Sequence, residues 1–263
     1  MTLRVGVMGA GGRMGQVVCQ AISAEDDLAL VAGIDPNFAG TDIGEVAGVE
    51  AGAFAVTADN EALVASGVEV VVDFTYPAAA RANLEFCAAQ GIHAVVGTSG
   101  FAAADYEEIA RSFTRSNCLI APNFAIGAVL MIRFAEMAAP YFDTAEIIEL
   151  HHDGKVDAPS GTAVSTAERM AAASAEWAPD PTKTETIVGA RGASGPAGIP
   201  VHSVRMRGMT AHQEVLLGTT GQTLTLRHDS FDRSSFMPGV ILAVHRIDST
   251  PGLTVGLDGL LDL

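Results

Sequence analysis

The N-terminal run of an apolar segment, a glycine-rich loop and a helical pattern limits the fold more than any other feature of this chain. Residues 3–8 read Leu-Arg-Val-Gly-Val-Met, a pattern typical of a buried β-strand. The loop Gly9-Ala10-Gly11-Gly12-Arg13-Met14-Gly15 follows, and a helical pattern runs from Gln16 to Ala24. A glycine loop in this position presents backbone N–H groups at a helix N-terminus, where they can bind a phosphate group. Glycine loops alone are weak evidence, but this order of elements predicts an α/β domain that binds a dinucleotide.

A carboxylate follows the second apolar segment, residues 28–34. Asp35 lies 20 residues after Gly15, which is where an acidic residue binds the adenosine ribose hydroxyls in dinucleotide-binding folds. Pro36 brings no positive charge for a 2′-phosphate, and Arg13 is the one candidate cation nearby. We therefore expect NADH to be favoured over NADPH as cofactor. The alternative is that Asp35 is an ordinary turn residue before Pro36.

Three further apolar segments, residues 68–74, 93–96 and 118–124, extend the expected parallel sheet. Ligands of open parallel sheets bind at the carboxyl ends of the strands. The turn Gly97-Thr98-Ser99 should therefore face the nicotinamide half of a cofactor, although as bare sequence it fits a capping turn equally well. Residues 37–66 carry few landmarks; their glycines suggest a loop, and residues 61–65 a short helix.

The pattern changes after Asn123. Helices are expected over residues 127–142 and 160–177, a strand over 145–150, and a strand-rich region from Thr184 onward, which predicts a mixed or antiparallel second sheet. The helical segment 233–246 and the tail are expected to return to the first domain. We predict a discontinuous dinucleotide-binding domain of residues 1–123 and 229–263, and a second, α+β domain of residues 124–228.

The chemically richest stretch is His151 to Ala163, directly after the predicted strand. Neighbouring strand residues point to opposite faces, so His151 and His152 should have different roles and should not share a metal ion. The turn at Gly154 brings Lys155 back toward the His151 side. An imidazole that titrates near neutral pH beside an ammonium group suits the protonation of a small acidic substrate.

The same stretch starts a helix at Pro159-Ser160-Gly161-Thr162, with Ser160 as the expected N-cap. The backbone N–H groups of Gly161 and Thr162 would then point outward and could bind a carboxylate or phosphate. A pair of histidines after a strand is more often packing than catalysis. The added lysine and helix start favour catalysis.

Composition excludes several functional classes. The chain has 263 residues and a formal net charge of −16, which disfavours binding to nucleic acid and to anionic membranes. Cys19, Cys87 and Cys118 are far apart, with no Cys-x-x-Cys pair, so neither disulfides nor a zinc site is expected, and no metal is assigned. We find no signal peptide or membrane-spanning segment in the sequence, and we expect a cytoplasmic protein.

Several motifs together resemble those of the dihydrodipicolinate reductase family, over the whole chain. They are Gly9-x-x-Gly12-x-x-Gly15, Gly97-Thr-Ser-Gly-Phe101, Ala121-Pro-Asn-Phe124, the run His-His-x-x-Lys-x-Asp-x-Pro-Ser-Gly-Thr from His151, Gly208-x-x-Ala-His-Gln-Glu-Val215 and His228-Asp-Ser230. The run from His151 is highly specific. The resemblance implies a Rossmann-type dinucleotide-binding domain with a substrate-binding and tetramerisation domain. It also implies an NAD(P)H-dependent reductase, a cytoplasmic homotetramer, that acts on a cyclic dicarboxylic intermediate of diaminopimelate and lysine biosynthesis.

The resemblance also implies roles for residues at matching positions. His151 matches the family's proton donor or acceptor, Lys155 its second proton donor, and the position of Ser160 at the helix start belongs to the same substrate site. His152, Gly161 and Thr162 match substrate contacts. Cofactor contacts are implied for Gly9, Ala10, Gly11, Gly12, Arg13, Met14, Asp35, Gly97, Thr98, Ser99, Ala121, Pro122, Asn123 and Phe124.

Two departures from the family pattern and two competing functions remain open. Pro36 stands where many relatives carry Arg or Lys, which puts NADPH use in doubt. Asp153 brings a negative charge between the histidines and Lys155, which weakens binding of a dianion unless its side chain points to solvent. The competing functions are an aspartate dehydrogenase-like enzyme and an NADH-binding sensor without turnover, and the His/His/Lys set argues against the sensor.

Overall fold

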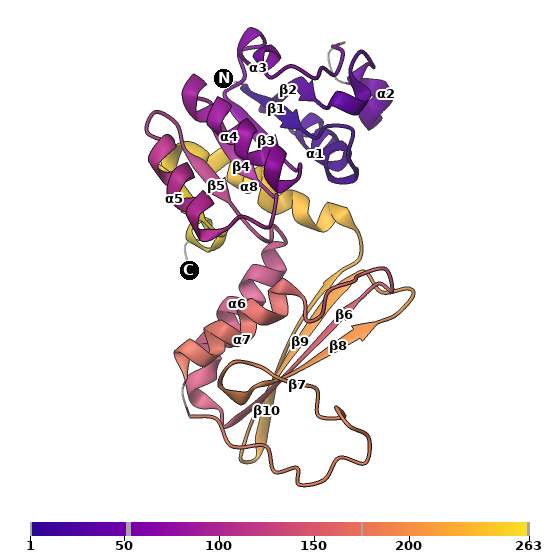
Figure 1. Cartoon of the computed structure of the whole chain (residues 1–263), viewed down its shortest axis with the longest axis vertical. Helices are drawn as coiled ribbons and strands as arrows, with labels where there is room; N and C mark the ends of the chain where they lie inside the picture. Colours follow the sequence, from indigo (N-terminus) through magenta and orange to yellow (C-terminus); the bar gives the residue numbers. More distant parts are fainter. Residues whose placement is uncertain (1, 51–53, 175, 262–263) are drawn as a thin grey trace. The chain divides into compact units, whose positions relative to one another are not determined.

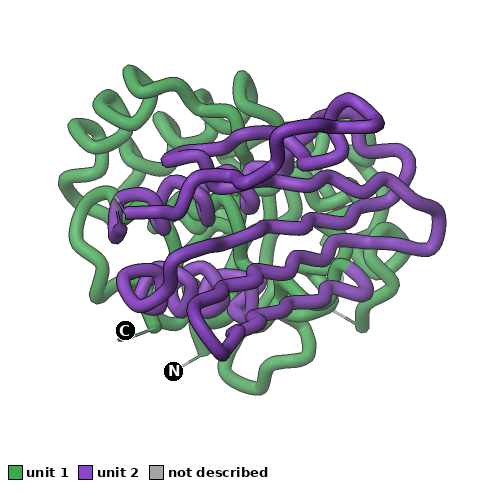
Figure 2. Tube along the Cα trace, turned by 90° about the horizontal axis from the view of Figure 1, so that it is seen from below, with its two compact units in different colours: residues 1–124, 233–263 green, residues 125–232 purple. Residues whose placement is uncertain are grey.

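The computed structural model describes residues 2–50, 54–174 and 176–261. The chain divides into two units, which Figure 2 colours separately. Unit 1 comprises Met1–Phe124 and Arg233–Leu263, and unit 2 comprises Ala125–Asp232.

Unit 1 is built on a parallel sheet of six strands in the order β11-β5-β4-β3-β1-β2. All-parallel sheets carry helices on both faces, so their strands are near-continuous apolar runs, as Val70–Asp73 illustrates with four buried residues. The strand order reverses beside β1, which has β2 on one side and β3 on the other. The strands are β1 (Leu3–Met8), β2 (Leu28–Ile34), β3 (Val70–Asp73), β4 (His93–Val96), β5 (Cys118–Ile120) and β11 (Leu253–Val255).

Helices connect these strands and pack against the sheet (Figure 1). Helix α1 shows why: its buried residues Gly15, Val18, Cys19 and Ile22 recur at helical spacing and form one apolar face. The helices of unit 1 are α1 (Arg13–Ser23), α2 (Ile43–Ala47), α3 (Glu61–Ala65), α4 (Pro77–Gln90), α5 (Ala103–Ser112) and α8 (Met237–Arg246), with 3-10 turns η1 (Pro36–Phe38), η4 (Arg233–Phe236), η5 (Ile247–Ser249) and η6 (Asp258–Leu260).

Unit 2 is a five-stranded mixed sheet, in the order β10-β9-β6-β8-β7, with two helices on one face (Figure 1). Strand β6 pairs parallel with β8 and antiparallel with β9. Alternate residues of β6, including Ile147, face the core between the sheet and the helices. The elements are β6 (Thr144–His151), β7 (Ala193–Ser194), β8 (Pro200–Arg205), β9 (Ala211–Thr219), β10 (Gln222–Ser230), α6 (Ile126–Ala138), α7 (Gly161–Ala173), η2 (Ala139–Tyr141) and η3 (Pro196–Gly198).

The predicted fold class, a parallel-sheet α/β domain with a second domain on a mixed sheet, is confirmed. Among the described residues, none of the helices combines the length and apolar character that crossing a bilayer requires. Three local predictions were wrong. Helix α7 ends at Ala173 rather than Trp177, residues 184–188 contain no strand, and the region expected as loop contains helix α2.

Each error has a local cause. Helix α2 has only five residues, too few for a periodic pattern, and its ends are fixed by the Asp42 carboxylate, which accepts from Gly44 N–H, and by Gly48 in the left-handed conformation. Trp177 lies beyond α7, where its indole N–H donates to the Ser174 carbonyl at 2.9 Å. The segment before β7 is held instead by Glu185, which accepts from the backbone N–H groups of Gly189 and Arg191.

Candidate functional site

The glycine loop, the 97–99 turn and the 121–124 turn all follow strands at the carboxyl edge of the sheet in unit 1. Gly9 N–H donates to the carbonyl of Ile34 at 2.8 Å, Gly97 N–H to that of Asp73 at 2.9 Å, and Ala121 N–H to that of Val96 at 3.0 Å. Parallel strands end at the same edge, so the structure brings together three segments that are far apart in the sequence. This edge is where open α/β sheets bind their ligands.

The glycines of the loop are required by close backbone approach. A Cβ on Gly15 would lie 1.9 Å from the carbonyl oxygen of Gly9, and one on Gly11 would lie 2.0 Å from the ring of Phe38. Gly9 has φ of +76°, in the left-handed region that favours glycine. Helix α1 begins after the N-cap Gly12, which has no side chain to cap it. The first N–H groups of α1 are therefore available to a ligand, and Arg13 and Met14 form its first turn.

Asp35 follows β2 and lies beside the glycine loop. Its carboxylate accepts from the N–H groups of Gly11 and Asn37, each at 3.0 Å. The side chain is buried at the end of β2, and it borders the cavity described next. Asp35 thus lies between the loop and that cavity, and it has a structural role in ordering both turns.

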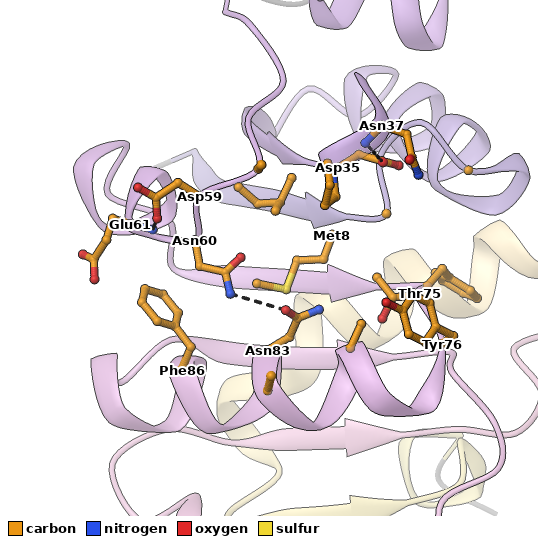
Figure 3. A pocket seen from close by; sticks show the side chains of 18 residues that line it. Met8, Asp35, Asn37, Asp59, Asn60, Glu61, Thr75, Tyr76, Asn83 and Phe86 are labelled. Carbon is orange, nitrogen blue, oxygen red and sulfur yellow. Dashed lines mark hydrogen bonds between the residues drawn. The ribbon is translucent and has the colours of Figure 1, made fainter. Parts of the chain in front are cut away.

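A cavity of about 870 Å³ opens beside Asp35 (Figure 3). Its walls come from the glycine loop, the end of β2, the start of α3, the segment after β3 and helix α4. Asn60 and Asn83 meet on one wall of it, where the Asn60 side-chain NH₂ donates to the Asn83 side-chain oxygen at 3.3 Å. The lining residues include Gly9, Gly12, Asp35, Asn37, Asp59, Asn60, Glu61, Thr75, Tyr76, Asn83 and Phe86.

These features fit a dinucleotide. The glycine loop borders the cavity at Gly9 and Gly12 and leads into the start of α1, where folds of this kind bind a pyrophosphate. The cavity offers an apolar wall at Phe86 and polar groups at Asp35 and Asn83. A ring and a ribose need that combination of surfaces.

The two other predicted cofactor turns are fixed by contacts that the sequence did not reveal. A Cβ on Gly97 would lie 2.0 Å from the ring of Phe74, whose centroid is 5.9 Å from that of Phe124. Thr98 is buried and its hydroxyl donates to Asp73 at 3.2 Å. Of the predicted cofactor residues, only Gly9, Gly12 and Asp35 line the cavity itself. Ser99, Pro122 and Asn123 belong to the turns at the same sheet edge.

Asp73 is a residue that sequence reasoning missed. It is fully buried at the end of β3, and its carboxylate accepts from Thr75, Asn83 and Thr98. It therefore ties helix α4 and the 97–99 turn to the sheet edge. An acidic residue at the end of an otherwise apolar strand was the available signal.

In unit 2, His151 is the last residue of β6 and its imidazole contacts Glu149 of the same strand. Nδ1 of His151 lies 2.5 Å from Oε2 of Glu149, a side chain with 0% exposure. Residues two apart on a strand share a face, which explains the contact. Burial lowers the pKa of His151, Glu149 raises it, and Lys155 and Arg205 lower it again; the net direction is downward.

Arg205 of β8 forms a bidentate ion pair with Glu149. Its Nη1 and Nη2 atoms lie 2.8 and 2.9 Å from the two carboxylate oxygens. Burial raises the pKa of Glu149, but hydrogen bonds from Arg205, Ser203 and His151 outweigh it, so the pKa is lowered overall. Glu149 is thus a buried anion surrounded by donors. The sequence analysis gave it no role, although the period-two alternation that separates His151 from His152 also puts Glu149 beside His151.

Lys155 lies in the turn after β6, and its ammonium group contacts both oxygens of Asp157 at 2.8 Å. The guanidinium of Arg207 contacts Asp153 at 2.8 Å, and both side chains are largely exposed. Asp153 therefore lies at the surface, which is the condition under which its charge should not weaken binding of a dianion. His152 is exposed.

Ser160 is the N-cap of α7, as predicted. Its hydroxyl accepts from Ala163 N–H at 3.2 Å, and its own N–H donates to Glu149 Oε1 at 3.1 Å. Gly161 and Thr162 follow as the first residues of the helix. The same carboxylate therefore contacts both the imidazole of His151 and the start of α7.

Potential metal ligands gather elsewhere. Glu25, Asp27 and His245 place one ligand atom each within 4.8 Å of one another, and all three are exposed. Exposed acidic groups commonly lie together without an ion, so this cluster gives no support for a metal centre.

Comparison with known proteins identifies the family. The model for the dihydrodipicolinate reductase N-terminus matches residues 3–124, and the model for its C-terminus matches residues 127–261. Curated proteins named 4-hydroxy-tetrahydrodipicolinate reductase from Nocardia farcinica and Corynebacterium aurimucosum are 52% and 53% identical, with 100% of both chains covered in each case.

Solved structures agree. A dipicolinate-bound dihydrodipicolinate reductase from Paenisporosarcina sp. TG-14 is 38% identical, with a TM-score of 0.87 and coverage of 98% of this chain and 99% of that one. An amine dehydrogenase from Mycobacterium smegmatis, at 14% identity and a TM-score of 0.68, with 98% and 96% covered, shares the fold alone. Because the two family models together span nearly the whole chain, and full-length relatives are about half identical to it, the chain belongs to the dihydrodipicolinate reductase family, which comprises the NAD(P)H-dependent 4-hydroxy-tetrahydrodipicolinate reductases of diaminopimelate and lysine biosynthesis.

Proposed function

We propose that this chain reduces 4-hydroxy-tetrahydrodipicolinate to tetrahydrodipicolinate, with His151 and Lys155 supplying the proton. The observation that carries the assignment of residues is the segment after β6. It combines an imidazole held by a buried carboxylate, an ammonium group and the start of helix α7 within a single stretch. Family membership supplies the reaction, and this segment supplies the groups that the reaction needs.

A bound nicotinamide dinucleotide supplies the hydride. The chain's part is to hold that cofactor at the carboxyl edge of the sheet in unit 1. The first turn of α1 would bind the pyrophosphate, and the cavity beside Asp35 would take the adenosine half. The turns at 97–99 and 121–124 would border the nicotinamide half.

NADH is the preferred cofactor in this proposal. Asp35, Asp59 and Glu61 line the cavity, and none of the described residues that line it is Lys or Arg. The 2′-phosphate of NADPH would therefore enter a site with three carboxylates and no cation, and repulsion between like charges would weaken its binding.

Proton delivery is assigned to the second unit. Protonated His151 can donate from Nε2, because its Nδ1 faces Glu149. Lys155 is a second donor at the same end of β6. Positioned proton transfer of this kind accelerates a reaction by about 10²- to 10⁴-fold.

One carboxylate of the substrate is assigned to the start of α7. The N–H groups of Gly161 and Thr162 lie in its first turn, where the helix dipole favours a negative charge. His152 would contact the same ligand. The relative from Paenisporosarcina is described as dipicolinate-bound, which supports a planar dicarboxylate as the ligand class. We further propose a cytoplasmic homotetramer.

The test is an absorbance assay of NADH oxidation with substrate generated from pyruvate and aspartate semialdehyde. Replacing His151 or Lys155 by Ala should lower kcat by about 10²- to 10⁴-fold and leave the Kd for NADH within about twofold of wild type. Lys183→Ala, which removes an exposed lysine from the same unit, is the matched control. Equal losses of turnover and of NADH binding would remove both residues from the catalytic role, and oxidation of free aspartate in place of the cyclic substrate would overturn the proposed reaction.

A further inference from the structure

Glu149 is surrounded by hydrogen-bond donors on both of its oxygens. Oε1 accepts from Arg205 Nη2 at 2.9 Å and from Ser160 N–H at 3.1 Å. Oε2 accepts from Arg205 Nη1 at 2.8 Å and lies 2.5 Å from His151 Nδ1. The side chain is fully buried on the face of the sheet that packs against α7.

An ionised carboxylate has lone pairs and no proton to donate. The bidentate guanidinium keeps Glu149 ionised, since a buried carboxylate beside Arg205 is far more stable as the anion. A nitrogen 2.5 Å from such an oxygen must therefore carry the hydrogen. His151 Nδ1 is thus protonated whether the ring is neutral or charged, and the titrating proton belongs to Nε2.

We infer that Glu149 is a positioning residue that fixes His151 as the Nδ1–H tautomer. Through its contact with the Ser160 N–H, Glu149 also keeps the imidazole at a fixed position relative to the start of α7. The inference deepens the proposed function and rests on the assignment of proton transfer to His151. It assigns a role to a buried side chain that the reaction itself does not touch.

The tautomer matters because His151 must lose its proton from the nitrogen that faces the substrate. When protonated His151 donates from Nε2, the neutral ring that remains is the Nδ1–H form, which Glu149 stabilises. The charged groups that face the ring are Glu149 on β6, Arg205 on β8 and Lys155 in the following turn. Among these, only Glu149 raises the pKa of His151, so its loss should lower that pKa further.

The contact with Ser160 adds a geometric link. Glu149 Oε1 accepts the N–H of the residue that caps α7, so one buried group contacts both the proton donor and the proposed site for the substrate carboxylate. A shift of Glu149 would move both together.

Glu149→Gln gives a specific test because the side-chain amide fits the hydrogen-bonding groups around it in only one orientation. Near Oε1, Arg205 and the Ser160 N–H can only donate, so the amide oxygen must stay there. The Ser203 hydroxyl, which also bonds the carboxylate, can donate or accept and fits either orientation. The NH₂ group then faces His151 Nδ1, which must become an acceptor. The tautomer of neutral His151 should switch to Nε2–H, and Arg205 Nη1 should lose its bond to Glu149 while keeping the one to the Val204 carbonyl.

The matched control is Glu146→Gln on the same strand. Glu146 contacts the Nε2 atom of His202 at 2.7 Å and forms an ion pair with Arg191, so it repeats the carboxylate, imidazole and guanidinium arrangement on the opposite face of β6. This variant also neutralises a glutamate between a histidine and an arginine. It should leave the tautomer of His151 unchanged.

The primary measurement is imidazole ¹⁵N NMR of the whole protein without substrate, at a pH where His151 is neutral. Wild type should show protonated Nδ1 and unprotonated Nε2 for His151; the opposite pattern would overturn the inference without any variant. Thermal melts establish that Glu149→Gln is folded, since removing the buried charge that pairs with Arg205 is destabilising.

Kinetics separate this inference from the proposed function. Glu149→Gln should lower kcat/KM by about 10²-fold or more, as expected for a general acid in the wrong tautomer, and move the alkaline limb of the pH profile to lower pH. NADH affinity should be unchanged. If wild type shows the Nδ1–H tautomer but no reductase activity, the proposed function fails and the tautomer assignment stands. A switched tautomer with an unchanged pH profile and rate would overturn the positioning role.

Discussion

The carboxylate of Asp35 accepts a hydrogen bond from the backbone N–H of Gly11 at 3.0 Å, so the residue that follows β2 directly orders the glycine loop that follows β1. The same side chain also accepts from Asn37 and borders the cavity of unit 1. One carboxylate therefore shapes the loop and offers a surface to a ligand.

Asp35→Asn should weaken NADH binding by about 10- to 100-fold, because hydrogen bonds to a charged group contribute about 1.5–3 kcal/mol each. The affinity for NADPH should fall less, since the variant removes a negative charge that repels the 2′-phosphate. Fluorescence titration with both cofactors measures the ratio. Asp42→Asn, at the exposed N-cap of α2, is the control. An unchanged ratio of the two affinities would show that Asp35 does not select the cofactor.

Gly15→Ala should destabilise unit 1, because the added Cβ would lie 1.9 Å from the backbone oxygen of Gly9. Overpacking of this kind costs about 1–3 kcal/mol, which exceeds the gain of about 1 kcal/mol for Ala over Gly inside a helix. Calorimetry should show a lower Tm, together with weaker NADH binding. Gly259→Ala adds a Cβ that meets no atom within 4 Å and should leave both quantities close to wild type.

Ser160→Ala should lower the free energy of unfolding by about 0.5–2 kcal/mol, because it removes the cap of α7 while leaving the N–H donated to Glu149 in place. Denaturant melts measure the loss. Ser112→Ala, whose hydroxyl donates to the Glu108 carbonyl on the surface of α5, is the control. A loss of stability no larger than that of the control would show that the cap contributes nothing measurable.

The stability of the protein should fall as the pH drops below the ordinary histidine value of 6.5. Burial lowers the pKa of His93, although Asp248 and Glu69 partly offset it, and its Nδ1 accepts from the N–H of Asn117 at 3.0 Å. Below pH 6.5 the unfolded chain binds protons that the folded chain does not, so the free energy of unfolding decreases. Burial lowers the pKa of His151 and His228 in the same direction.

Melts between pH 5 and pH 7.5 check this expectation. His93→Gln should flatten the dependence of Tm on pH, because one of the shifted groups is gone. The same slope in variant and wild type would assign the pH dependence to other groups.

Several features of the site were predictable because they depend on neighbours in the chain. The apolar run of β1, the glycine loop and the start of α1 lie within one short segment, and Ser160 caps α7 through a contact three residues away. Strand alternation also separated His151 from His152. These relationships follow from backbone geometry that local sequence encodes directly.

Other features depended on which strands pair and in what register. Across β6 and β8, Glu149 is paired with Ser203, and His151 is paired with Arg205. The ion pair between Glu149 and Arg205, which holds the imidazole, therefore joins residues 56 positions apart in the sequence. Asn60 and Asn83 approach each other from α3 and α4 to form one wall of the cavity.

By itself the sequence determined most of the helices and strands, the glycine loop and the cap of α7, because each is set by contacts within a few residues. Only the tertiary structure decided that Asp73 holds the sheet edge of unit 1 together and that Glu149 and Arg205 order the end of β6 in unit 2. Their partners come from separate strands and helices, and burial of a charge is stable only where those distant donors converge on it.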